Sequence, residues 1–127
     1  MYFPLLQFLS CLRFLPDMAY HEFGILSTHE EQRHAYFEYT PEKFSCIRVD
    51  MSLIDSCGLF LELQDLPTYF QRISWPAYGF DEAGITLIPP DSLPRLRAAA
   101  ARHGLTELTA LVEQAEQMRC FVIHFGI

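Results

Sequence analysis

The sequence predicts a single α+β domain whose sheet is mixed or antiparallel, contains four to five strands and is covered by about three helices. A chain of 127 residues with 50% hydrophobic residues is long enough for one domain with its own core. The predicted elements run strand, strand, helix, strand, strand, helix, helix, strand, which excludes regular alternation of strands and helices. The apolar run Cys120–Phe125 is typical of a strand in the middle of a sheet.

Two strands are predicted near the start of the domain. Tyr20–Ser27 and Phe44–Val49 combine β-branched and aromatic residues with partial apolar alternation. The stretch between them, Thr28–Lys43, is polar and aromatic without a clear period. We expect it to be a loop with one helical turn.

A helix is predicted from its cap at Asp50 through Leu63, because Ile54, Cys57 and Leu61 follow the helical period. Gly58 weakens its middle by about 1 kcal/mol relative to alanine, so tertiary packing must support it.

The next stretch of chain contains one strand and one loop. Pro67 is expected to end the helix, and Thr68–Ile73 has strand propensity. Ser74–Glu82, which contains Trp75, Pro76 and Gly79, is expected to be a loop.

The stretch that follows predicts a buried strand and a sharp corner. Gly84–Ile88 is apolar and β-branched, and Pro89-Pro90 then prevents both helix and ladder hydrogen bonding. Asp91 or Ser92 is the expected cap of the next helix.

Two helices, roughly Ser92–His103 and Glu107–Arg119, are expected to form an antiparallel hairpin. Gly104 ends the first helix, and Thr106 is the expected cap of the second. One face of the second helix carries Leu108, Leu111, Val112, Ala115 and Met118.

Residues 1–17 differ in composition from the rest of the chain, and we interpret them as an N-terminal extension before a native start at Met18. Residues 18–127 are then the domain. The apolar run in residues 1–17 is too short to span a bilayer, and it lacks the features of a secretory signal. As a helix, this run would need a groove or a second chain to cover it, so a dimer through residues 1–17 is one option.

Charge and cysteine usage restrict the partners and the compartment. Sixteen acidic residues against nine basic ones give a net charge of −7, which argues against a nucleic-acid partner. The acidity fits either a basic protein partner or simple solubility. The four cysteines form no CxxC pair, and three lie among apolar residues, which is typical of reduced thiols in a cytoplasmic protein.

Few residues suggest catalysis or metal binding. His29 and His34 are five residues apart, so they do not share a helical face as a metal-binding pair would, and we expect no metal site. His21 and His124 lie on predicted strands and could meet across the sheet. A catalytic histidine needs a nucleophile or an acid within hydrogen-bond reach. The candidates are Glu22, Cys46 and Asp50, but the sequence does not bring them together with a histidine.

Four blocks of sequence carry a resemblance to a known group: FSCIRVD, LPTYF, YGFDEAGITLIPPDSL and CFVIHFGI. The chain from about Ala19 onward resembles short uncharacterised bacterial proteins with a YGITLIPPxSL block and a terminal FVIHFGI. Some of these are similar to immunity proteins of polymorphic toxin systems. The resemblance implies no catalytic motif or cofactor. Where the group tends to have an aromatic residue before Gly84, this chain has Ala83.

Two functions remain as hypotheses. The first is a protein-binding module of the immunity type that occludes the surface of a partner toxin. The second is a small enzyme that uses His124 or the stretch from His29 to His34. The expected partner-binding residues of the first are acids and aromatics near predicted loops: Glu30, Glu31, Tyr36, Tyr39, Trp75, Tyr78, Asp81 and Glu82.

Overall fold

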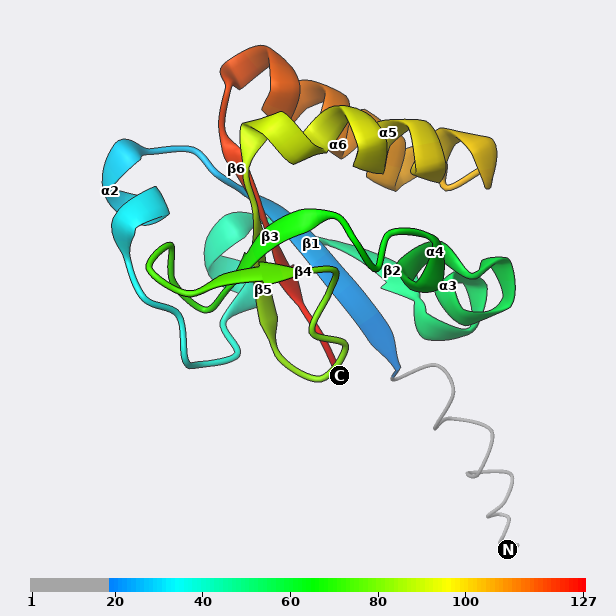
Figure 1. Cartoon of the computed structure of the whole chain (residues 1–127), viewed down its shortest axis with the longest axis horizontal. Coiled ribbons are helices and arrows are strands. Elements are labelled where there is room, and N and C mark those ends of the chain that lie inside the picture. The colour runs from blue at the N-terminus through cyan, green and yellow to red at the C-terminus, as the bar shows by residue number, and fades with distance from the viewer. Residues whose placement is uncertain (1–18) are drawn as a thin grey trace, which may run out of the picture.

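A six-stranded sheet in the order β2-β1-β6-β5-β3-β4 forms the centre of the molecule, and every neighbouring pair is antiparallel. The structure is a computed structural model that describes residues 19–127. The expected extension, residues 1–17, and Cys11 with it lie outside the described residues. The strands are β1 (Tyr20–Leu26), β2 (Ile47–Asp50), β3 (Pro67–Phe70), β4 (Pro76–Tyr78), β5 (Ile85–Ile88) and β6 (Phe121–Phe125) (Figure 1).

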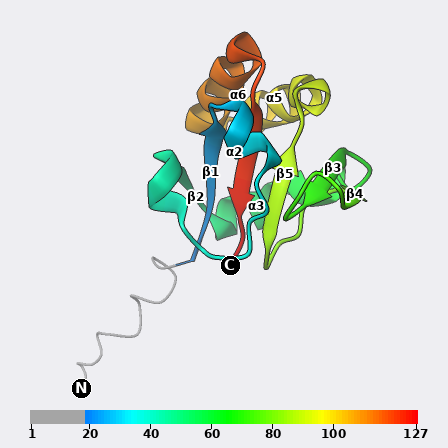
Figure 2. The same ribbon diagram turned by 90° about the vertical axis from the view of Figure 1, so that its left-hand side faces the viewer.

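The helices gather on different sides of this sheet. Figure 1 shows α5 and α6 side by side, with α2 and the α3–α4 pair at opposite sides of the strands. Figure 2 shows the same arrangement, with α2 in front of β1 and β6. The helical segments are α2 (His29–Arg33), η3 (Pro41–Phe44), α3 (Met51–Cys57), α4 (Leu59–Glu62), η4 (Pro90–Ser92), α5 (Leu93–Arg102) and α6 (Thr106–Met118). None of the helices within residues 19–127 is both long and apolar enough to cross a membrane.

The predicted class, a single α+β domain with an antiparallel sheet and three main helices, is confirmed. The sheet has one strand more than the expected four to five, because Pro76–Tyr78 pairs with Pro67–Tyr69 instead of lying in a loop. Proline is tolerated there because β4 is an edge strand, where one side of the backbone needs no ladder partner.

The last strand lies in the middle of the sheet, as its apolar sequence predicts. β6 pairs with β1 on one side and with β5 on the other. Phe23 and Thr86 both lie opposite His124, so these three residues share one face of the sheet. We call this the inner face, and the opposite one, which includes Ile123 and Leu87, the outer face.

Each face has its own hydrophobic core. On the inner face, Phe23 and Val122 pack with residues of α3, α4, α5 and α6. On the outer face, a smaller cluster forms under the segment that joins β1 to β2, and its buried members are Leu26, Tyr36, Ile85, Leu87, Ile123 and Phe125. A sheet that is apolar on both faces needs both to be covered, and these two clusters meet that requirement.

The helix expected from Asp50 to Leu63 is two short helices, α3 and α4. Asp50 caps α3 as predicted, with its side chain accepting a hydrogen bond from the backbone N–H of Ser52 at 2.8 Å. Gly58 then adopts the left-handed conformation (φ 71°) and ends α3. The glycine therefore breaks the helix rather than only weakening it.

One prediction about a helix start and one about a strand start are wrong, and one cap is only partly as expected. Ser92 occupies the N-cap position of α5, but its side chain makes no capping hydrogen bond, because its hydroxyl donates to the carbonyl oxygen of Pro67 at 2.6 Å. Thr106 is the first residue of α6 rather than its cap. β2 begins at Ile47 because Ser45 is left-handed (φ 50°), which interrupts an extended run from Phe44.

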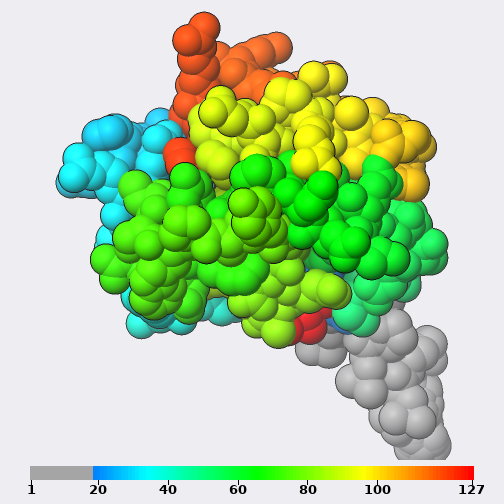
Figure 3. All heavy atoms as spheres, viewed as in Figure 1, coloured from blue at the N-terminus to red at the C-terminus, as the bar shows by residue number. Residues whose placement is uncertain are grey.

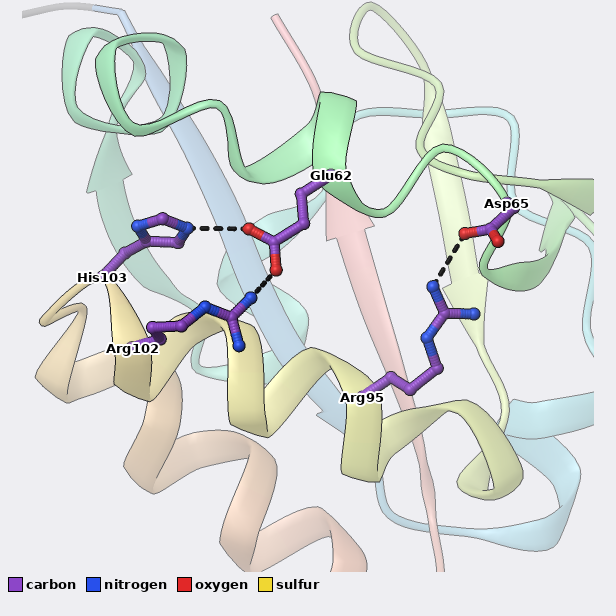
Figure 4. Close-up of polar contacts among 5 residues, drawn as sticks. All are labelled: Glu62, Asp65, Arg95, Arg102 and His103. Atoms are coloured by element: carbon purple, nitrogen blue, oxygen red, sulfur yellow. Dashed lines mark hydrogen bonds and ion pairs between the residues drawn. The ribbon is translucent and has the colours of Figure 1, made fainter.

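Ion pairs on the surface join α4 and the turn after it to α5. The carboxylate of Glu62 contacts both Arg102 and His103, and Asp65 accepts a hydrogen bond from Arg95 at 2.7 Å (Figure 4). This hydrogen bond holds the pKa of Asp65 below its usual value. Exposed pairs contribute little to stability, so we regard this cluster as orienting α4 on α5.

The expected face of α6 is only partly buried. Leu108, Val112 and Ala115 are buried in the inner core, Leu111 is half-buried at its margin, and Met118 is 43% exposed. The buried part of this helix face is therefore narrower than its row of apolar residues.

We expect Leu108→Ala to lower the free energy of unfolding by about 2–5 kcal/mol, because the side chain is 1% exposed and its removal leaves a cavity. Denaturant unfolding measures this loss. Leu111→Ala, one turn away on the same helix, is the matched control and should cost clearly less. Equal losses would contradict the packing described for α6.

Candidate protein-binding surface

The outer face of the sheet is covered by residues 27–44, which we call the covering segment. Tyr36 anchors it: the ring is buried in the outer core, its hydroxyl donates to the carbonyl of Glu31 at 2.7 Å, and its N–H donates to the carbonyl of Gln71 at 2.8 Å. Burial raises the pKa of Tyr36 to about 12. The expectation that Tyr36 is available at the surface is therefore wrong.

The start of the covering segment is a capped helical turn. Thr28 and Glu31 form a capping box around the N-terminus of α2, which a T-x-x-E spacing allows. The Glu31 carboxylate also accepts from the backbone N–H of Ser27 at 2.9 Å. Of the two expected acids here, Glu31 is thus engaged by the backbone, whereas Glu30 is exposed.

Exposed aromatic rings follow the buried anchor. Phe37 and Trp75 are 58% and 46% exposed and meet edge to face, with ring centroids 5.9 Å apart. The guanidinium of Arg72 lies 5.5 Å from the Trp75 ring. Phe37 was absent from the expected partner-binding residues; its position in a polar, aromatic loop beside Tyr36 was the available signal.

Tyr39 continues this line toward the β1 side. Its ring is 62% exposed and packs edge to face on Phe125, with centroids 5.8 Å apart. Its hydroxyl donates a hydrogen bond to the buried carboxylate of Glu22. Burial raises the pKa of Glu22, and the nearby charge of Arg48 only partly offsets this effect.

Hollows lie on both sides of Phe37. One, of about 530 Å³, is lined by acidic and aromatic residues that include Glu30, Glu31 and Glu38. The other has the same volume, and its lining includes Phe37, Tyr39, Phe125 and Ile127. Phe37 contributes to both, so the two hollows are adjacent.

The β3–β4 hairpin and the loop after it carry the remaining expected residues. In Figure 3 these segments cover the front of the molecule. Tyr78 is 71% exposed on edge strand β4, and Glu82 is exposed. The Asp81 carboxylate accepts from the N–H of Ala83 at 3.3 Å, so it helps to shape the loop.

We define the acidic aromatic surface as Glu30, Phe37, Glu38, Tyr39, Trp75 and Glu82. Its aromatic members are joined by ring contacts or by the shared hollows, and its acids border them. Glu82 belongs to it because its carbonyl accepts from the N–H of Ile127, which lines the second hollow.

His21 and His124, which the sequence allows to meet across the sheet, do so. Nδ1 of His21 lies 2.9 Å from Nε2 of His124, and the two side chains are 1% and 0% exposed. The nucleophile and acid candidates do not join them. Cys46 packs toward Gly24 and Phe44 at the outer face, Glu22 also points to that face, and Asp50 caps α3.

The other histidine candidates are apart from any cluster. His29 begins α2 and His34 follows it, and both are exposed. The His34 ring contacts the Tyr36 ring with centroids 5.1 Å apart. Within residues 19–127, no group of three or more His, Cys, Asp or Glu side chains is arranged to hold a metal ion.

Comparison of the chain with protein-family models, curated proteins and solved structures gave no match.

We expect Cys46 to react slowly with alkylating reagents. Burial and the charges of Glu22 and Glu42 raise the pKa of its thiol to about 12, which leaves roughly a thousandfold less thiolate at pH 8 than a thiol of ordinary pKa. Timed iodoacetamide labelling with peptide mass spectrometry measures the rate at each cysteine. In urea, Cys46 should react like the other cysteines; fast labelling in the folded protein would contradict the burial.

Proposed function

We propose that this protein is a binding module of the immunity type, which neutralises a basic partner toxin by covering part of its surface. The observation that supports this most is the acidic aromatic surface, where Phe37, Tyr39 and Trp75 are exposed. Within residues 19–127 the other Phe and Tyr rings, apart from Tyr78, are buried or half-buried. Exposed aromatic groups of this kind are typical of protein contacts.

The charge around these rings favours a basic partner. Glu30 and Glu38 line one hollow with Phe37, and Glu82 is exposed next to Ala83, which lines the other hollow with Phe37 and Tyr39. The whole chain carries a net charge of −7. Opposite charges on a partner would accelerate encounter and orient the two proteins before the rings make contact. The resemblance to bacterial proteins similar to immunity proteins points to the same kind of partner.

The covering segment supports the proposal because it is held in place before any partner binds. The Tyr36 anchor, its hydrogen bonds and the α2 capping box fix the backbone before Phe37, and the hydrogen bond from the Tyr39 hydroxyl to Glu22 holds the segment after it. A surface that is already ordered loses less conformational entropy on binding, so more of the contact energy appears as affinity.

The alternative of a small enzyme has less support. His124 has no exposed surface, and the two 530 Å³ hollows among the described residues are lined by other side chains. A general base must reach the proton that it removes, and a substrate has no visible route to this ring. His29 and His34 are exposed, but within residues 19–127 neither ring makes a hydrogen bond to a group that could orient it or that it could activate.

The first test measures association with the product of the reading frame immediately upstream of this gene. We expect Glu38→Lys with Glu82→Lys to slow association on the order of tenfold at low salt and to weaken its salt dependence, because steering charges are reversed. Glu107→Lys with Glu113→Lys, on exposed positions of α6, makes the same change in net charge elsewhere and is the control. Equal slowing in both variants would show that only net charge matters.

The second test measures dissociation of the same complex. We expect Trp75→Ala or Phe37→Ala to raise the dissociation rate by about 30-fold or more, as loss of a central aromatic contact does. Leu61→Ala, at a 71% exposed position on α4, should leave this rate unchanged. If neither aromatic variant affects binding or protection of cells from the upstream gene product, the acidic aromatic surface is not the binding site.

A further inference from the structure

The buried histidine pair is a polar contact inside an otherwise apolar core. His21 belongs to β1 and His124 to β6, and the backbone pairing of these strands ends at Glu22 opposite Phe125. Beyond the last backbone pair, the two strands are also connected by side chains, through the 2.9 Å contact between the ring nitrogens of the two histidines. It joins positions that are 103 residues apart in the chain.

Aromatic rings enclose the pair. Phe60 of α4 lies edge-on to His21 at 4.8 Å between centroids and stacks on Phe80 at 4.4 Å. Phe80 and Phe23 lie 5.2 and 5.1 Å from the His124 ring. The pair is thereby separated from water, which would otherwise stabilise a charged imidazole.

The hydrogen bond requires one ring to donate and the other to accept. Two neutral imidazoles satisfy this in either of two tautomeric arrangements. On the far side of His124, Nδ1 lies 3.4 Å from Oγ1 of Thr86, which accepts from the N–H of Asp81 at 2.9 Å. If both rings were imidazolium, with a proton on each of their nitrogens, N–H would face N–H and the contact would break.

The surroundings offer little compensation for a positive charge. Phe60 on α4, Phe80 in the loop before β5, Phe23 on β1 and Thr86 on β5 are uncharged, and Val49 of β2 lies opposite His21. The charged group that acts on His21 is Asp55 of α3, and burial outweighs it, so the pKa of His21 is lowered. The pKa of His124 is lowered further, by burial and by His21.

We propose that the His21–His124 pair is a pH switch: the folded protein holds both rings neutral, and their protonation opens the domain. This inference is independent of the proposed function, because it concerns the inner core rather than the acidic aromatic surface. At neutral pH the pair links β1 to β6; in acid, the rings gain protons only when Phe60 and the α3–α4 pair leave the sheet.

The direction and size of the pH effect on folding stability follow from the number of protons bound by the folded and unfolded chains. The native pKa values are lowered, so the unfolded chain, with histidine pKa values of about 6.5, binds more protons and stability falls as pH falls below this value. With both rings neutral in the folded state, the folding equilibrium constant should fall about 100-fold between pH 7.5 and pH 5.5. Glu22 acts in the opposite direction, because its native pKa is raised.

The first experiment uses the full chain and follows imidazole ¹⁵N chemical shifts by NMR from pH 7.5 to pH 5.5 under folded conditions. His29 and His34 are exposed and serve as internal references in the same spectra. We expect His21 and His124 to keep the shifts of neutral tautomers throughout. Movement of the nitrogen shifts of either ring to imidazolium values within this range would overturn the proposal.

The second experiment measures urea unfolding over the same pH range. The double variant His21→Phe and His124→Phe keeps ring size inside the aromatic enclosure and removes both protons, so the 100-fold pH effect should be lost. His34→Phe is the matched control and should retain it, and Glu22 is common to all three proteins. A pH effect of equal size in the double variant would overturn the proposal. If the double variant does not fold, the NMR titration decides alone.

Discussion

The position of β6 in the middle of the sheet is the constraint on which the rest of this structure depends. β6 pairs with β1, the first strand of the described region, and with β5, so the middle of the sheet forms only when strands distant in the sequence come together. Apolar residues alternate onto both faces of β6, with Val122 inside and Ile123 outside. Neither face can be left in water, and each therefore requires its own cover.

The two covers differ, and the difference generates the candidate surface. Four helices cover the inner face, whereas the outer face is covered by an irregular segment with one short helix and one 3₁₀ turn. Such a segment has few backbone hydrogen bonds of its own, so it depends on side chains such as Tyr36 to hold it. Tyr36 is buried in the outer core, and the next residue, Phe37, lies at the surface. Covering a sheet and presenting a binding surface are thus performed by the same residues.

In the inner core, polar side chains bind each other and are buried, instead of lying at the surface. His21 and His124 satisfy each other within an aromatic enclosure, whereas replacing one of them alone would leave the other without its partner. A hydrogen bond between neutral groups also specifies which residues of β1 and β6 lie together, which apolar contacts do less strictly. The chemistry of imidazole then connects this structural contact to pH, since no other side chain has an ordinary pKa so near neutrality.

The sequence by itself determined the class of the fold, the central place of Cys120–Phe125 and the cap at Asp50, because periodicity, capping and strand apolarity are local signals. It allowed His21 and His124 to meet, but only the pairing of β1 with β6 brought them together. It did not determine that Gly58 splits a helix or that Pro76–Tyr78 forms an edge strand, since both depend on what the neighbouring segments require. It also could not separate Tyr36 from Phe37: the two rings are adjacent in one aromatic loop, and burial of one rather than the other depends on how that loop crosses the sheet. Only the tertiary structure decided this, because exposure is a property of distant residues brought together and not of the residue itself.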